Sequence, residues 1–333
     1  MQARGRGTVR PPLGIAFDGD LGNRVDAILA VSMLNGFASK GEARQIALCV
    51  SRPSLESAQL AEVVAGFYAG RQPGRGGAGA PIEMIGVPDV GRGDEAALLA
   101  SILSRTTPDG RPQYTTSLTR LLETPDSAVH IRNKLLAQND GNATVVLAGS
   151  ATGLARMLSL YGSLPQISVK VRQLVVAIGA FPSGTAEPSV KDDVAGARKL
   201  FAEWPTPIVA VGSEVGAALP YPASSIETDF TWAPAHPVVD AFRALKPTLH
   251  ATPWTALAAM LYAVRQDEAG FTLSEPGTIS VLDDGRTQFT AGGKGTHRYL
   301  IADPAQTDKV IKAYRDMASA QPVQRPGRRG GEA

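Results

Sequence analysis

The chain has 333 residues, 44% of them hydrophobic, which is enough to bury a large core. The formal net charge is only +2, and the basic residues are scattered apart from short clusters at the two ends, so we expect no nucleic-acid partner. The single cysteine, Cys49, excludes an internal disulfide framework and a thiolate metal cluster. No apolar run approaches the roughly 20 residues that span a bilayer, so no membrane association is expected.

The two ends of the chain are predicted to lie outside the folded domain. Residues 1–11 have the charge of an export signal but no apolar stretch behind it, and they are predicted to be flexible. We therefore expect a cytoplasmic protein, with export by a signal already removed as the open alternative. The stretch 320–333 is polar and rich in Gly and Pro, which predicts a disordered tail.

Between these ends, short apolar runs rich in β-branched residues alternate with longer helix-like stretches. The runs begin at Pro12, Gln45, Ile82, Thr144, Leu174 and Pro207. The helix-like stretches include 26–37, 57–68, 151–160, 193–203 and 255–264. This alternation predicts one α/β domain over 12–302, built on a doubly wound, mainly parallel sheet. Two further runs joined by Asp-Asp-Gly predict a small C-terminal β-hairpin at about 271–290.

Three aspartates follow the first predicted strand: Asp18 and Asp20 at its end and Asp26 at the start of the next helix. Ligands of doubly wound sheets gather at the carboxyl ends of the strands. Because close carboxylates repel one another, such a cluster must be offset by a cation, by bound protons or by helix N-terminal amides. A helix cap would explain Asp26 alone, but not Asp18 and Asp20. Oxygen ligands of this kind suit Ca²⁺ or Mg²⁺, so a divalent cation site is predicted.

Other enzyme classes are less well supported by the sequence. The pair Asp18 and Asp20 could be the DxD of a haloacid-dehalogenase-type phosphatase, but that family has Thr or Val where this chain has Gly22. There is no GxSxG motif for a serine hydrolase and no His-x-x-x-His pair for zinc.

The segment FDGDLGNRVDA, residues 17–27, resembles the DxDPGxDDA motif of the inosine-uridine-preferring nucleoside hydrolases, with one extra residue in the turn. Segments 145–158, 186–216 and then 236–242 with 252–265 resemble later parts of the same family, in the same order. The resemblance covers most of residues 12–300. It implies a Rossmann-like nucleoside hydrolase fold and hydrolysis of the N-glycosidic bond of a ribonucleoside by a Ca²⁺-activated water.

The same resemblance implies which residues hold the metal. Asp20 matches the metal-binding general base, and Asp26 matches a second metal-binding aspartate. Ala148 matches the position whose backbone carbonyl reaches the metal. Thr255 stands where the last carboxylate ligand is expected, and it is included as a weak or water-mediated ligand. The implied cofactor is Ca²⁺.

The resemblance also implies a substrate shell. Asp18 matches an aspartate that supports the site, and Glu187 matches a glutamate that helps to bind the sugar. Ser189 replaces a sugar-binding amide, and Asn23 stands in the turn that carries a ribose-binding aspartate. Trp254 is a candidate for stacking on the base, with plain packing as the alternative.

The chain departs from the family at four positions that matter, Val25, Gly153, Ser189 and Thr255. Two hypotheses therefore stay open. One is a working N-ribohydrolase acting on a nucleoside. The other is a catalytically inactive relative that serves as a sugar- or nucleoside-binding or structural module. Members of the family form dimers or tetramers, so a homo-oligomer is expected, while base specificity is left open.

Overall fold

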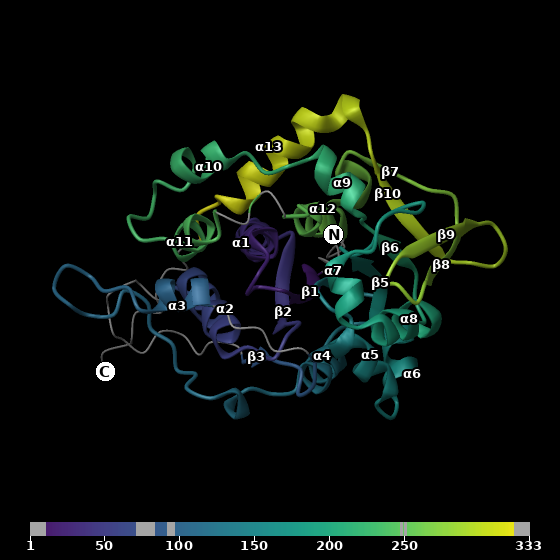
Figure 1. The fold of residues 1–333 in the computed structure, drawn as a ribbon, viewed down its shortest axis with the longest axis horizontal. Coiled ribbons are helices and arrows are strands. Elements are labelled where there is room, and N and C mark those ends of the chain that lie inside the picture. The colour runs from purple at the N-terminus through teal and green to yellow at the C-terminus, as the bar shows by residue number, and fades with distance from the viewer. Residues whose placement is uncertain (1–10, 71–83, 92–96, 247–248, 250–251, 323–333) are drawn as a thin grey trace, which may run out of the picture.

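The computed structural model describes residues 11–70, 84–91, 97–246, 249 and 252–322, which form one sheet covered by helices on both faces (Figure 1). The strand order is β3-β2-β1-β4-β5-β6-β10-β8-β9, and β7 pairs with β10. From β3 to β10 this order is parallel, whereas β7, β8 and β9 run antiparallel to their neighbours. The predicted doubly wound, mainly parallel sheet is therefore confirmed.

All six predicted strands are present, as β1 to β6 of the strands given next. The strands are β1 (Leu13–Gly19), β2 (Ala43–Val50), β3 (Ile85–Gly86), β4 (Ala143–Ala148), β5 (Val171–Val176), β6 (Ile208–Ala210), β7 (Phe271–Leu273), β8 (Gly277–Val281), β9 (Thr287–Ala291) and β10 (His297–Ala302). The helices are α1 (Val25–Ser39), α2 (Leu55–Tyr68), α3 (Ala97–Leu103), α4 (Ser127–Leu136), α5 (Thr152–Ser159), α6 (Ser163–Lys170), α7 (Pro188–Asp192), α8 (Val194–Glu203), α9 (Ser213–Ala218), α10 (Ala223–Thr228), α11 (Pro237–Ala244), α12 (Thr255–Arg265) and α13 (Thr307–Ala318).

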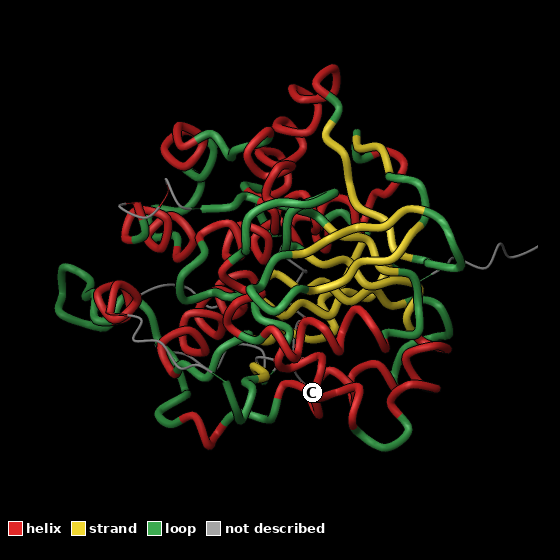
Figure 2. Tube along the Cα trace, turned by 45° about the vertical axis from the view of Figure 1, so that its right-hand side comes forward, coloured by secondary structure: helices red, strands yellow, loops and turns green. Residues whose placement is uncertain are grey.

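The core lies on both faces of the sheet, because successive strand residues point in opposite directions. In β1, Ile15 and Phe17 join the apolar cluster that contains residues of α1, α2, α12 and α13. Ala16, between them, joins the cluster that contains residues of α4, α5 and α8. Burial on both faces explains why these strands are continuous apolar runs instead of alternating ones. Figure 2 shows the strands gathered between the helices.

The C-terminal part of the sheet differs in detail from the prediction. The hairpin is formed by β8 and β9, so it spans 277–291. The run at 271–273, which we assigned to the hairpin, instead pairs with β10. Strand β10 was not predicted, although it lies beside β6 in the parallel part of the sheet. Its parallel neighbour β6 comes from a distant part of the chain, and short-range pattern does not reveal that pairing.

The folded region extends past residue 302, where we expected the domain to end. Helix α13 packs along α1, and Val310, Tyr314 and Met317 are buried in the core. The two helices approach closely at Gly36, where an added Cβ would lie 2.0 Å from the carbonyl oxygen of Met317. The predicted flexible segment 1–11 and disordered tail 320–333 lie almost entirely outside the described residues.

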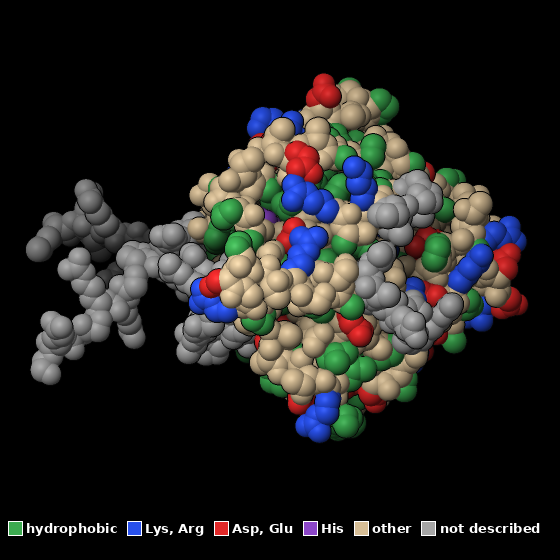
Figure 3. All heavy atoms as spheres, turned by 60° about the vertical axis from the view of Figure 1, so that its left-hand side comes forward, with side chains coloured by type: hydrophobic (Ala, Val, Ile, Leu, Met, Phe, Trp, Pro, Cys, Tyr) green, Lys and Arg blue, Asp and Glu red, His purple; other side chains and the backbone are tan. Residues whose placement is uncertain are grey.

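In the described part of the chain, each helix lacks either the length or the hydrophobicity required to cross a bilayer. Figure 3 shows one face of the molecule, on which basic and acidic side chains are interspersed.

Replacing Gly36 with Ala should destabilise the protein. The new methyl group would overlap the Met317 backbone, an overpacking that costs about 3 kcal/mol, whereas better helix propensity returns only about 1 kcal/mol. We expect a net loss of about 2 kcal/mol in the free energy of unfolding, measured by urea denaturation. Lys309→Ala, on the exposed face of α13, is the control and should change stability by less than about 0.5 kcal/mol. Equal stability of Gly36→Ala and the wild type would contradict this docking of α13.

Candidate functional site

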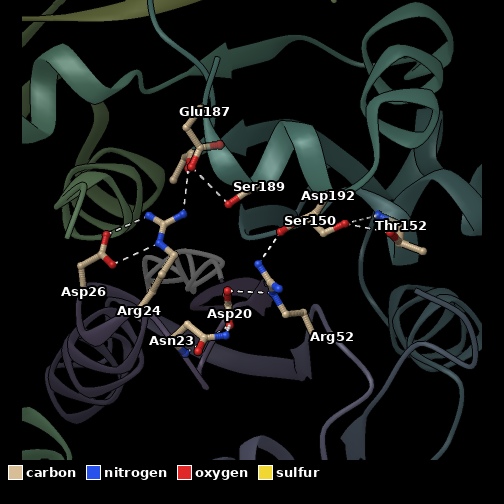
Figure 4. Close-up of polar contacts among 11 residues, drawn as sticks. Asp20, Asn23, Arg24, Asp26, Arg52, Ser150, Thr152, Glu187, Ser189 and Asp192 are labelled. Atoms are coloured by element: carbon tan, nitrogen blue, oxygen red, sulfur yellow. Dashed lines mark hydrogen bonds and ion pairs between the residues drawn. The ribbon is translucent and has the colours of Figure 1, made fainter. Parts of the chain in front are cut away.

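The candidate site lies where the winding of the sheet changes direction. Strands β2 and β3 lie on one side of β1, and β4, β5 and β6 lie on the other. The carboxyl ends of β1 and β4 therefore border the crevice at which doubly wound sheets bind ligands. Asp18 and Asp20 come at the end of β1, and Ala148 ends β4. Figure 4 shows the polar side chains that meet there.

Asp26 is bound to an arginine of its own turn. Arg24, the residue before α1, directs Nε and Nη2 to the two carboxylate oxygens of Asp26, at 3.2 and 2.9 Å. Arg24 Nη2 also donates to Thr255 Oγ1 at 2.8 Å, and Nη1 reaches the Ala177 carbonyl at 3.4 Å. Burial lowers the pKa of Arg24, but the ion pair with Asp26 outweighs it and raises that pKa overall. The guanidinium therefore joins α1, α12 and the end of β5.

The Asp26 carboxylate also serves the N-terminus of α12. The backbone N–H of Ala256 donates to Asp26 Oδ2 at 3.0 Å, and this helix has no capping side chain of its own. A carboxylate is stabilised at this end of a helix by the unpaired amides and the helix dipole. The first turn of one helix thus caps another helix that lies far away in sequence.

Asp20 is bound to a second arginine. Arg52, which follows β2, places Nε 2.9 Å from Asp20 Oδ2 and also pairs with Asp192. The other oxygen, Oδ1, accepts weak hydrogen bonds from the backbone N–H and the side-chain amide of Asn23, at 3.3 and 3.4 Å. Burial raises the pKa of Asp20, and Arg52 and then Arg24 lower it in part.

Asp18, two residues before Asp20 in the chain, has no partner among the described residues. Its side chain is fully buried, and neither carboxylate oxygen makes a hydrogen bond. Burial raises its pKa to about 7. An added Cβ at Gly153 would lie 3.0 Å from Asp18 Oδ2 and 2.6 Å from Ser127 Oγ, whose hydroxyl is also unpartnered. Gly153 lies beside Asp18 but has no side chain that could donate a hydrogen bond to it.

Glu187, the residue before α7, faces the Arg24 guanidinium, and Ser189 in the first turn of α7 lies beside Glu187 (Figure 4). Ser189 Oγ donates to Glu187 Oε1 at 3.2 Å, whereas Glu187 Oε2 accepts no hydrogen bond from the described residues. Burial raises the pKa of Glu187, and the nearby Arg24 lowers it in part. Trp254 is 9% exposed and stacks on Tyr221, with ring centres 6.5 Å apart. Its position is that of a packed side chain in the core.

The predicted metal ligands do not fit Ca²⁺ as they are arranged. Asp26 is held by Arg24 and Ala256, and Asp20 by Arg52 and Asn23. The Ala148 carbonyl accepts the backbone N–H of Asp20 at 3.0 Å, and Thr255 Oγ1 accepts from Arg24. Ca²⁺ requires six to eight oxygen ligands. Among the described residues, no group of three or more His, Cys, Asp or Glu side chains is placed to hold a metal ion.

Sequence reasoning missed Arg24 and Arg52. Arg24 lies inside the resembling motif, in the turn that is one residue longer than in the family. Arg52 follows the second predicted strand by two residues, and the carboxyl ends of parallel neighbours meet at one edge of the sheet. Both positions were therefore visible as basic residues beside the acidic cluster. What the sequence did not contain was the direction of their side chains.

No family model and no curated protein sequence matches this chain. Solved structures of nucleoside hydrolases do share its fold. A plant nucleoside hydrolase aligns with 93% of this chain and 100% of its own, at a TM-score of 0.64 and 19% identity. A purine-preferring ribonucleoside hydrolase from Gardnerella vaginalis aligns with 93% of this chain and 99% of its own, at a TM-score of 0.67 and 14% identity.

The type III effector protein XopQ, in complex with adenosine diphosphate ribose, also has this fold. It covers 94% of this chain and 95% of its own, at a TM-score of 0.65 and 14% identity. The nucleoside hydrolase-like fold implied by the sequence resemblance is thus confirmed. Proteins that share a fold can differ in chemistry, so the activity must be argued from the site.

Replacing Asp18 with Asn should remove a pH-dependent loss of stability. The folded-state pKa of about 7 lies above the ordinary value of 3.8, so the stability that protonated Asp18 contributes is complete below about pH 4 and is lost as the pH rises to about 7. This difference corresponds to at most about 4 kcal/mol. The free energy of unfolding of Asp18→Asn minus that of the wild type should therefore increase from about pH 4 to about pH 7 and stay constant at higher pH.

Urea denaturation at several pH values measures this effect, and Asp308→Asn, an exposed position on α13, is the matched control. A constant difference between Asp18→Asn and the wild type from pH 4 to pH 8 would show that Asp18 is ionised in the folded protein throughout.

Proposed function

We propose that this protein binds the ribosyl group of a nucleoside or related small molecule and does not hydrolyse it. The observation that carries the proposal is a buried oxygen of the Glu187 carboxylate that lacks a hydrogen-bond donor among the described residues. The Glu187 side chain is only 9% exposed, yet Oε2 accepts no hydrogen bond from the described residues. Buried polar atoms normally have partners. The hydroxyl groups of a sugar are donors of the kind that Glu187 Oε2 lacks.

The charges around Glu187 favour a neutral ligand. Asp20, Asp26 and Asp192 are already paired with Arg24 and Arg52. With Glu187 included, carboxylates outnumber guanidiniums, so a phosphate placed among them would meet repulsion. Nucleoside hydrolases act on nucleosides, and XopQ has been seen with adenosine diphosphate ribose. A ribosyl group is common to these ligands, which supports a ribosyl ligand here.

The partners of the Asp20 carboxylate argue against hydrolysis. A general base must reach the water from which it takes a proton. Asp20 Oδ2 is held by Arg52, and Oδ1 accepts from Asn23. Both carboxylate oxygens of Asp20 therefore already have partners on the protein. The arrangement therefore supports the inactive, ligand-binding alternative over the hydrolase that the motif resemblance implies.

The ligand prediction is tested by calorimetric titration with inosine, adenosine and uridine, each compared with its 2′,3′-dideoxy analogue. We expect a ribonucleoside to bind at least about tenfold more tightly than the analogue, because the analogue lacks the 2′- and 3′-hydroxyl donors. Glu187→Gln should weaken ribonucleoside binding by about ten- to a hundredfold. Glu203→Gln, an exposed position on α8, should leave it unchanged.

Ribose release is measured in the same samples, with Ca²⁺ and then with a chelator. We expect no release in either case. Release that requires Ca²⁺ and is lost in Asp20→Ala would establish the hydrolase instead, and binding of none of these nucleosides by folded protein would refute the ribosyl ligand.

A further inference from the structure

We infer that Arg24 and Arg52 are a built-in replacement for a divalent cation, so that the wild-type chain neither needs nor binds Ca²⁺ at this site. Arg24 neutralises Asp26, and Arg52 neutralises Asp20. Two guanidiniums together supply the two positive charges that one divalent ion would bring. This inference concerns the cation alone and holds whether or not a nucleoside binds.

The geometry of Arg24 supports it. The guanidinium is planar and presents its donors in a fixed fork that matches a carboxylate in a bidentate fashion. Here the fork closes on Asp26, while one of its nitrogens also reaches Thr255 Oγ1 at 2.8 Å. Thr255 in turn donates to the Ala177 carbonyl at 3.3 Å. Arg24 therefore joins two of the four predicted metal ligands, which is the cross-link that a bound ion would make.

The Thr255 hydroxyl is consistent with this exchange. A carboxylate at this position would add a further negative charge beside one guanidinium, in a place where Asp26 is fully buried and Arg24 is 7% exposed. A hydroxyl accepts the same hydrogen bond without adding charge. Two features therefore fit the replacement of a divalent ion by a monovalent side chain. One is the longer turn that carries Arg24, and the other is the hydroxyl, instead of a carboxylate, at Thr255.

A bound Ca²⁺ would have to displace these interactions. The guanidinium N–H groups occupy the oxygens that the ion would need, and their positive charge repels it. Removal of the Arg24 side chain reverses both effects. It leaves Asp26 buried beside the Thr255 hydroxyl, with the Ala256 amide as its remaining donor among the hydrogen bonds of the described residues, and an uncompensated buried carboxylate attracts any available cation.

The test is a Ca²⁺ titration followed by melting temperature and by calorimetry, without any nucleoside. We expect millimolar Ca²⁺ to leave the wild type and Arg24→Lys unchanged, because both keep a cation at the site. Arg24→Ala should melt lower than the wild type and should gain about 2 °C or more with Ca²⁺. Arg24→Ala combined with Thr255→Asp should gain more, and Arg24→Ala combined with Asp26→Asn should gain nothing.

Arg243→Ala is the matched control, since its ion pair with Glu227 lies on the surface, and it should show no response to Ca²⁺. If Arg24→Ala does not fold without Ca²⁺, Arg24→Gln is titrated in its place with the same expectation. A Ca²⁺-dependent rise in the melting temperature of the wild type would overturn the inference, and so would the absence of a gain in the variants that lack the Arg24 charge. Neither result bears on ribosyl binding, which is measured separately.

Discussion

Buried carboxylates at the carboxyl end of β1 must be neutralised, and the site is organised around that requirement. A cation, a proton or helix amides can each do so, and this chain supplies all three from within. Arg52 pairs with Asp20, and Arg24 pairs with Asp26. The first turn of α12 gives Asp26 an additional amide, and burial raises the pKa of Asp18 to about 7.

The neutralising groups meet only because the sheet changes its winding direction at β1 and β4. That change brings the turn before α1, the loop after β2 and the start of α12 to one edge of the sheet. Arg24 then binds a carboxylate of α1 and a hydroxyl of α12 in a single guanidinium fork. The same contacts that balance the charge also hold α12 against α1, so local electrostatics and helix packing depend on each other.

In this chain, the fold that it shares with nucleoside hydrolases carries carboxylates paired with guanidiniums. An ion can be removed by a chelator and can bind both ligand and water, whereas a guanidinium is permanent and its donors are already committed. A site neutralised in this way still has an oxygen, Glu187 Oε2, that accepts no hydrogen bond from the described residues, and this is the oxygen that we propose receives a sugar hydroxyl. Under this proposal, binding and catalysis are separable because they would draw on different groups of the same site.

The sequence by itself determined the six strands of a mainly parallel sheet and the acidic residues that follow the first of them, because apolar runs and strand-end motifs are short-range patterns. It also placed Asp20, Asp26 and Thr255 in one site through the family resemblance. Only the tertiary structure decided how Asp20 and Asp26 are neutralised. The direction of the Arg24 side chain depends on α12, which begins more than two hundred residues later, and hydrogen bonds across such a distance follow from packing instead of local pattern.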